Sequence, residues 1–397
     1  MTRVVSRRGF LGAMGGAAPL AGAPAPRIVS VKATPVALAK RFANRRPSFT
    51  SDIDPARWRH NGPFAQLNGA VMVEIKTDQG ITGYGLGGGG GAASYVIEHH
   101  LADLLVGANP LHVEALWDQM YSSTLLYGRR GLVIMAISGM DHALWDIAGK
   151  HAGKPVHDLL GGPIKDKVPS YYTGPVERGL ELGVRAFKLG VREGVREGRE
   201  GMKKLEERLR RARQAIGPDA ELMIDCITTW DVPHTLEMAE RLRDVRLAFI
   251  EEPLSPDDIE GYETLCRQVS GTRIASGEHE YTRFGFQILL RHNAVHILQP
   301  DLTWCGGLTE IRRVAAMAAA KSLPVIPHRG GSVYGLALIL TAPNCTLAES
   351  FGLDEDSNDL MKALAPPFDK GHYYPPTKPG FGAELNEELI RKHAQRT

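Results

Sequence analysis

The sequence predicts an α+β domain followed by a TIM-like (β/α)₈ barrel, and three observations support this fold class. The chain has 397 residues, 43% of them hydrophobic, so it is long enough for two domains with cores of their own. Apolar residues alternate near the N-terminus and then follow helical periods up to about residue 151. Beyond residue 163 short apolar runs alternate with helical segments eight times, the pattern of a closed barrel of parallel strands.

The first domain begins with alternating runs that predict a small antiparallel sheet. Residues 28–39 and 70–75 alternate, and a turn at 78–80 leads into a further run from 81 to 85. The glycine run 87–91 is not followed by the Gly-Lys-Ser/Thr of a phosphate-binding loop, so it is interpreted as a flexible loop. Helical patterns follow at 92–105, 112–126 and 132–151.

Eight short apolar runs predict the barrel strands. They lie at 168–172, 186–189, 221–224, 247–250, 273–275, 296–298, 324–326 and 346–348. The last helix of the series is expected to be irregular, and the proline-rich chain after Ser350 is expected to pack back on the first domain. The expected boundaries are 26–150 for the first domain, 151–350 for the barrel and 351–397 for the C-terminal segment.

The first 25 residues predict a targeting segment. Residues 6–11, Ser-Arg-Arg-Gly-Phe-Leu, resemble the twin-arginine export pattern, and a short Ala/Gly/Leu stretch follows them. We expect a periplasmic or exported protein, or a cytoplasmic one if the signal is not used. A disordered start with a chance arginine pair is the alternative interpretation. No later segment is expected to span a membrane.

The balance of charges argues against nucleic acid as a partner. The 47 basic and 45 acidic residues give a net charge of +2, too small for the positive surface that nucleic-acid binding needs. The four cysteines are scattered without a CxxC pair, so neither a zinc site nor a disulfide framework is indicated. We expect a small-molecule partner and a homo-oligomer.

Polar residues stand at or just after the predicted strands, where barrel enzymes place their catalytic groups. Any one strand end can carry a charge simply because it is exposed. Seven charged or titrating side chains among eight ends, five of them acidic, are difficult to explain in that way. In strand order the eight residues are Tyr172, Lys188, Asp225, Glu251, Glu278, Asp301, His328 and Glu349.

Three successive strand ends predict a metal site. Asp225, Glu251 and Glu278 should converge on one side of the barrel mouth, where their carboxylates repel one another unless a cation lies among them. An all-oxygen ligand set suits a hard ion, which predicts Mg²⁺, with Mn²⁺ as the alternative. His279 and Glu280, beside Glu278, are competing candidates for the third ligand.

The opposite side of the mouth carries a candidate general base. His328 follows the seventh predicted strand and Asp301 follows the sixth. A carboxylate that binds one imidazole nitrogen fixes the tautomer and raises the basicity of the other nitrogen. A lone histidine after proline is more often structural, but a position opposite a predicted metal site favours catalysis.

Several motifs resemble those of the mandelate racemase branch of the enolase superfamily. They are Phe249-Ile250-Glu251-Glu252-Pro253, Ser276-Gly277-Glu278-His279, Gln299-Pro300-Asp301, Trp304-Cys305-Gly306-Gly307-Leu308-Thr309 and Val325-Ile326-Pro327-His328. Within that branch the chain is most similar to the L-rhamnonate dehydratases, through patterns resembling Trp117-Asp118-Gln119-Met120, Ala136-Ile137-Ser138-Gly139, Asp225-Cys226, Ser332-Val333-Tyr334 and Pro379-Gly380-Phe381-Gly382. The resemblance covers about residues 66 to 390.

The resemblance implies a capping domain, Mg²⁺ held by the three predicted ligands, and His328 with Asp301 as the catalytic pair. Removal of a proton next to a carboxylate would give an ene-diolate, which Mg²⁺ stabilises when it chelates that carboxylate. The resemblance also implies that Glu349 hydrogen-bonds the substrate carboxylate, for which it would have to be protonated. A purely structural carboxylate is the alternative for Glu349.

The second predicted strand separates the reactions of the branch. Its racemases and cycloisomerases carry a Lys-x-Lys motif whose second lysine is the base on the opposite face, whereas this chain has Lys188-Leu189-Gly190. Racemisation by two bases is therefore disfavoured. Lys188 is a candidate contact for the substrate carboxylate, and a lysine that extends from the barrel rim to solvent is the alternative.

The predicted activity is a hydro-lyase reaction, the Mg²⁺-dependent dehydration of an aldonic acid to a 2-keto-3-deoxy acid. L-Rhamnonate is one candidate substrate. Tyr172, and Arg46 or Arg59 in the loop 41–66, are candidate substrate contacts. At the mouth, Arg329-Gly330-Gly331 follows His328 where the family typically has Gly-Ser-Ser. An epimerase acting through the same ene-diolate and a non-catalytic exported sugar-acid binding protein are the alternatives.

Overall fold

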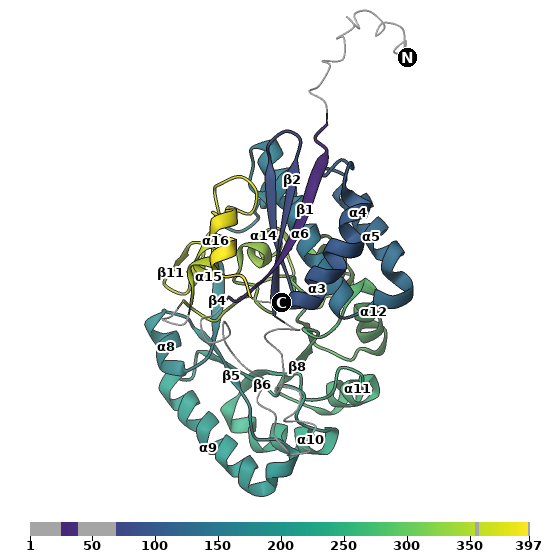
Figure 1. The fold of residues 1–397 in the computed structure, drawn as a ribbon. Helices are drawn as coiled ribbons and strands as arrows, with labels where there is room; N and C mark the ends of the chain where they lie inside the picture. The colour runs from purple at the N-terminus through teal and green to yellow at the C-terminus, as the bar shows by residue number, and fades with distance from the viewer. Residues whose placement is uncertain (1–24, 39–68, 354–356, 396–397) are drawn as a thin grey trace, which may run out of the picture.

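The structure is a computed structural model that describes residues 25–38, 69–353 and 357–395 (Figure 1). The twin-arginine pattern and the loop that carries Arg46 and Arg59 lie outside the described residues. The described chain forms a three-stranded sheet with its helices, a barrel, and a C-terminal segment beside the sheet.

The first domain is an antiparallel sheet covered by helices. Its strands, in the order β1-β2-β3, are Ile28–Val36, Ala70–Thr77 and Thr82–Gly87. The central helix α6, Leu132–Ala152, lies close to β3, because a Cβ added at Gly85 would come within 2.0 Å of a backbone oxygen of α6. The remaining helices are α3 Gly90–Val96, η2 Ile97–Leu101, α4 Ala102–Leu105 and α5 Val113–Gly128.

Helix α6 is apolar around most of its circumference. Among the described residues it is long and apolar enough, by length and composition alone, to cross a membrane, and 83% of its most apolar window is buried inside the protein. It packs on β2 and β3 and against α5 and α13 (Gly307–Ala319). A helix that is buried on all sides is expected to be hydrophobic all round, so its composition is explained by its place in the core.

The barrel strands run parallel, and helices follow most of them. The strands are β4 Val168–Thr173, β5 Ala186–Gly190, β6 Glu221–Asp225, β7 Leu247–Glu251, β8 Arg273–Ser276, β9 Ile297–Leu298 and β10 Ala348–Ser350. The main helices are α8 Val176–Glu181, α9 Gly198–Ile216, α10 Val232–Arg241, α11 Ile259–Gln268, α12 Thr282–His292, α13 and α14 Val333–Thr341. Pairing of β10 with β4 joins the last strand to the first, so the predicted barrel is confirmed.

Two of the eight predicted units depart from the regular pattern. The seventh run forms one isolated bridge, Leu298 to Val325, rather than a strand, and a second bridge joins Asp301 to His328 just after it. The eighth strand begins two residues later than predicted and is followed by a five-residue helix, α15 Asp359–Ala363. The barrel is therefore modified at its closure, where the chain leaves for the C-terminal segment.

The C-terminal segment contacts both the barrel and the first domain. Strands β11 Phe368–Asp369 and β12 His372–Tyr373 form a hairpin that extends the sheet antiparallel to β4. Helix α16, Glu387–Lys392, lies on β1 (Figure 1). The backbone of Ala394 bridges to Val36 at the end of β1.

Candidate active site

The three predicted metal ligands meet at the carboxyl ends of neighbouring strands. Asp225 and Glu251 are the last residues of β6 and β7 and lie opposite each other in the register, while Glu278 follows β8 by two residues. Each can offer one carboxylate oxygen, and these oxygens lie within 4.8 Å of one another. An all-oxygen set of this size fits a hard divalent cation.

The electrostatics of the triad also fit a cation. Burial raises the pKa of each of the three carboxyl groups to about 7. Lys188 opposes this for Asp225 and Glu251, and each pKa is raised further by a neighbouring carboxylate. Bringing three carboxylates together in a buried place costs free energy, and a divalent cation would offset that cost.

Lys188 is a buried cation between Glu251 of the triad and Glu349. It is 1% exposed, and its Nζ donates to both oxygens of Glu251, at 2.7 and 2.8 Å. The same Nζ lies 2.8 Å from Oε1 of Glu349. The three ammonium protons are thereby directed at carboxylates of the protein in the metal-free site, and the expected contact of Lys188 with a substrate carboxylate stays a prediction.

The surroundings of Glu349 favour its ionised form in the metal-free site. Burial alone would raise its pKa, but Lys188 and His328 outweigh burial and lower the pKa to about 2. Thr173 donates to Oε1 at 2.5 Å, and the backbone N–H of Arg329 donates to Oε2 at 2.8 Å. In the metal-free site Glu349 thus accepts hydrogen bonds as a carboxylate, and its expected contact with a substrate carboxylate stays a prediction.

His328 and Asp301 form the predicted pair. Asp301 Oδ2 lies 2.7 Å from Nδ1 of His328. The backbone N–H and Oγ1 of Thr303 donate to the other oxygen of Asp301, at 2.6 and 2.5 Å. These bonds fix the carboxylate, which in turn directs the Nε2 atom of His328 toward Glu278 Oε2 at 3.8 Å and Glu349 Oε2 at 3.9 Å.

The pKa of His328 reflects the charges around it. Burial lowers this pKa, but Glu278, Glu349 and Asp301 together outweigh burial and raise it to about 9. A divalent cation among the triad would offset the charge of Glu278 and so lower the pKa of His328 toward the range of a general base.

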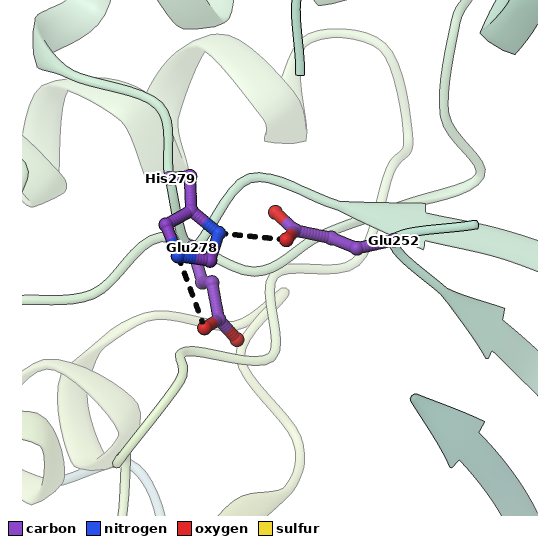
Figure 2. Close-up of side chains that lie close together, drawn as sticks. All are labelled: Glu252, Glu278 and His279. Carbon is purple, nitrogen blue, oxygen red and sulfur yellow. Dashed lines mark hydrogen bonds and ion pairs between the residues drawn. The ribbon is translucent and has the colours of Figure 1, made fainter. Parts of the chain in front are cut away.

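The two competing candidates for the third ligand have different surroundings. Glu280 Oε1 accepts the backbone N–H of Tyr281 at 2.7 Å, and among the described residues it belongs to no candidate metal group. Figure 2 shows His279 between two carboxylates, with Nδ1 2.7 Å from Glu252 and Nε2 3.7 Å from Glu278. Burial lowers the pKa of His279, but Glu252 outweighs it and raises the pKa to about 10.

A hollow of about 620 Å³ opens at the other end of the barrel. It lies at the amino ends of β6, β7 and β8 and is lined by residues that include Arg213, Arg246 and Arg273. Its lining also includes His296, but none of the candidate metal groups found among the described residues lies there. Because barrel chemistry is placed at the carboxyl ends of the strands, we assign the candidate site to the triad and His328.

Comparison with known proteins decides the family. Residues 63–161 match the mandelate racemase / muconate lactonizing enzyme N-terminal domain, and residues 175–389 match the enolase C-terminal domain-like family. The chain belongs to the mandelate racemase/muconate lactonizing enzyme family. The match confirms the resemblance. The N-terminal model covers the capping domain and the C-terminal model covers the barrel, in the order seen in the structure.

Members of the family with assigned activities are similar over most of the chain. A putative L-rhamnonate dehydratase of Caldivirga maquilingensis is 40% identical over 81% of this chain and 82% of its own length. The L-rhamnonate dehydratase of Saccharopolyspora erythraea is 39% identical over 81% and 84%. The crystal structure of rhamnonate dehydratase from Gibberella zeae complexed with Mg has a TM-score of 0.82 at 31% identity and covers 94% of this chain and 97% of that one. This family member is therefore an enzyme, a hydro-lyase of the dehydratase class.

The remaining predicted substrate contacts are Tyr172, which the structure describes, and Arg46 and Arg59, which it does not. Tyr172 is buried at the end of β4, where its ring packs near Gly174, Gly179 and Gly352. Arg46 and Arg59 belong to the part of the chain that the structure does not describe, so their role stays a prediction.

The sequence interpretation missed three residues that support the site. Gln299 donates to Glu251 Oε2 at 2.8 Å, Thr173 donates to Glu349, and Thr303 holds Asp301. The Asp-x-Thr spacing of residues 301–303 is that of an Asx turn, and it could have indicated Thr303. The other two contacts join residues far apart in the sequence, so no local pattern indicates them.

Proposed function

We propose that the chain dehydrates an acid sugar with Mg²⁺ held by Asp225, Glu251 and Glu278, giving a 2-keto-3-deoxy acid. The observation that carries the proposal is that Nε2 of His328 points at the triad, 3.8 Å from Glu278. A base in this place can reach a proton on the carbon next to a carboxylate that the metal holds.

The chemistry needs a base and a charge that favours the intermediate. Mg²⁺, when bound, would stabilise the negative charge that develops on the substrate carboxylate. His328 takes the α-proton, and Asp301 stabilises the imidazolium that results. The ene-diolate then expels the β-hydroxyl with a proton as water, and the enol product becomes the 2-keto-3-deoxy acid.

His328 is also the group that we infer assists the departing hydroxyl. Gly190 offers no side chain that could act as a second base. An added Cβ there would meet only Ile227 Cδ1, at 4.0 Å, so the space beside Gly190 is open. Lys188 is engaged by Glu251 and Glu349. A single imidazole that accepts the α-proton and returns it to the leaving group requires both on one face, which predicts syn elimination.

The test is a screen of aldonic acids, L-rhamnonate among them, with Mg²⁺ or Mn²⁺ and detection of 2-keto-3-deoxy products. A product of unchanged mass would instead favour an epimerase, and binding without any turnover would favour a sugar-acid binding protein. We expect loss of water. If no acid in the panel is dehydrated in the presence of either metal, the proposed function is wrong.

His328→Asn tests the base. It should lower both dehydration and exchange of the α-proton with deuterated solvent by about 10²- to 10⁴-fold, the usual contribution of a general acid–base group. Mg²⁺ affinity should stay near that of the native protein, since His328 is not a ligand. Exchange at the native rate in this variant would show that another group removes the proton.

A further inference from the structure

Arg329 places a guanidinium at the mouth of the site, next to the catalytic pair. Its side chain is 40% exposed and lies over the Trp304 ring, 5.2 Å from the ring centre. Among the described residues its nearest recorded carboxylate is Asp301, with Nε 3.9 Å from Oδ2, which is too long for a hydrogen bond. The guanidinium therefore has donors that no carboxylate of the described chain occupies.

The backbone at Arg329 is strained in a way that favours glycine. Its φ is 55°, in the left-handed region that side chains with a Cβ seldom adopt. The turn is held by the backbone N–H of Arg329, which donates to Glu349, and by that of Gly330, which donates to Pro327. A non-glycine residue that persists in such a conformation beside a catalytic group suggests that its side chain has a function.

Arg329 lies on the side of His328 away from the triad. Its guanidinium is near Asp301, which binds Nδ1 of His328, whereas Nε2 points at Glu278. We consider a substrate whose carboxylate lies at the triad and whose α-carbon lies at Nε2 of His328. Its remaining carbons would extend away from the triad, on the side of the mouth that does not hold the metal ligands. The buried Trp304 ring lies 5.5 Å from the His328 ring and carries the Arg329 guanidinium over it, so a substrate that extends past His328 along this side would meet Arg329.

We propose that Arg329 binds a second carboxylate at the far end of the substrate, so that the preferred substrate class is an aldaric acid, a sugar acid with a carboxylate at each end. This rests on the proposed function, because it assumes that the first carboxylate lies at the triad. A planar guanidinium donates two parallel hydrogen bonds to a carboxylate, and neither a terminal methyl nor a hydroxymethyl group can accept this pair.

The experiment compares acids that differ only at the last carbon. One series is 6-deoxy-L-mannonate (L-rhamnonate), L-mannonate and L-mannarate, and a second is 6-deoxy-D-galactonate, D-galactonate and galactarate. In the configuration that the enzyme accepts, kcat/KM for the diacid should exceed that for the 6-deoxy acid by about 10- to 100-fold. Equal values, or a preference for the 6-deoxy acid, would overturn the proposal.

Arg329→Gly is the matched variant, because glycine adopts the observed φ without strain and keeps the backbone N–H that Glu349 accepts. Its melting temperature should be equal to or above that of the native protein. The ratio of kcat/KM between diacid and 6-deoxy acid should fall toward one. Arg329→Lys, which keeps the charge but loses the planar pair of donors, should give an intermediate ratio.

Measurements of substrate affinity distinguish failure of the Arg329 proposal from failure of the proposed dehydration. In the His328→Asn background, where turnover is blocked, the Kd of each acid can be measured by calorimetry with Mg²⁺ present. Adding Arg329→Gly should weaken the diacid about 10- to 100-fold more than the 6-deoxy acid. An equal effect on both acids would overturn the role of Arg329 while leaving dehydration intact, whereas absence of turnover with every acid in the native protein would instead reject the proposed function.

Discussion

Lys188 is a buried cation whose three protons are all directed at carboxylates. Replacing it by methionine would leave Glu251 and Glu349 buried beside each other without their counter-ion. Breaking a buried pair by removing one partner typically costs about 3–5 kcal/mol of stability. We expect Lys188→Met to lower the free energy of unfolding of the metal-free protein by this amount, as measured by denaturant titration.

The control for this variant is Lys204→Met on α9, where the lysine side chain is 64% exposed and pairs across one turn with Glu200. Exposed pairs contribute little, so the control should stay within about 0.5 kcal/mol of the native protein. Equal stability of the two variants would contradict the structural role of Lys188.

The raised pKa values of the triad predict how metal binding depends on pH. Burial raises the pKa of Asp225 from 3.8, and those of Glu251 and Glu278 from 4.5, to about 7. The folded, metal-free protein therefore keeps protons on these groups between pH 4 and 7 that the unfolded chain would release. The stability that this protonation supplies is present at low pH and is lost as the pH rises through 7.

Mg²⁺ requires the ionised carboxylates, so its binding must release protons below pH 7. We expect the affinity for Mg²⁺ to rise from pH 5.5 to about 7.5 and then to level off. Calorimetry in two buffers with different ionisation enthalpies measures the protons released at each pH. Affinity that is independent of pH over this range, with no proton release at pH 6, would show that the triad is already ionised without metal.

At the scale of elements, periodicity predicted seven of the eight barrel strands close to their observed positions. It failed at the seventh, because residues 324–326 are apolar enough for a strand but form only one isolated bridge, from Val325 to Leu298 of β9. The ends of the predicted strands correctly placed the candidate site residues at one mouth, because all strands of a parallel barrel end at the same mouth. The close contact between Glu349 and Lys188 could not be predicted, since the two residues are 161 positions apart in the sequence.

The glycine run that the sequence indicated as a flexible loop instead packs against the active site. The backbone N–H of Gly88 donates to Thr303 O at 2.9 Å, and a Cβ at Gly88 would lie 2.5 Å from Cδ1 of Trp304. Gly88→Ala should therefore displace Trp304 toward His328 and disturb the loop that holds Asp301. We expect kcat to fall about tenfold or more, as a small misplacement of a catalytic group does.

Mg²⁺ affinity tests whether the effect of Gly88→Ala is local, because the atoms nearest to the new methyl group belong to Trp304 and Met135 and not to the triad. It should be unchanged. The variant should also be partly rescued by Trp304→Phe, whose smaller ring makes room for the new methyl group. Full activity of Gly88→Ala alone would contradict the close packing of the two domains at this point.

At the scale of the whole molecule, the two domains and the C-terminal segment depend on one another. Asp141 on α6 accepts the backbone N–H and the Oγ1 of Thr309 at the start of α13, at 2.9 and 2.5 Å. Ser138, also on α6, accepts the N–H of Gly306. The capping domain thus fixes the loop that runs from Asp301 to α13. The catalytic pair of His328 and Asp301 is therefore positioned by both domains. The expected homo-oligomer stays a prediction.

Export of the folded protein is the prediction that concerns the chain as a whole. It rests on the sequence of residues 6–11, which lie outside the described residues. The twin-arginine route carries proteins that have already folded, and a barrel that closes only when β10 pairs with residues of β4 that lie 178 positions earlier suits such a route. Receptors read the arginine pair itself as an address rather than its charge.

Replacing Arg7 and Arg8 by lysine should therefore retain the protein in the cytoplasm, as measured by cell fractionation, with dehydratase activity per molecule unchanged. Lysine replacement at Arg27, which lies just before β1, is the matched control and should leave fractionation as in the native protein. A native protein found only in the cytoplasm would contradict export.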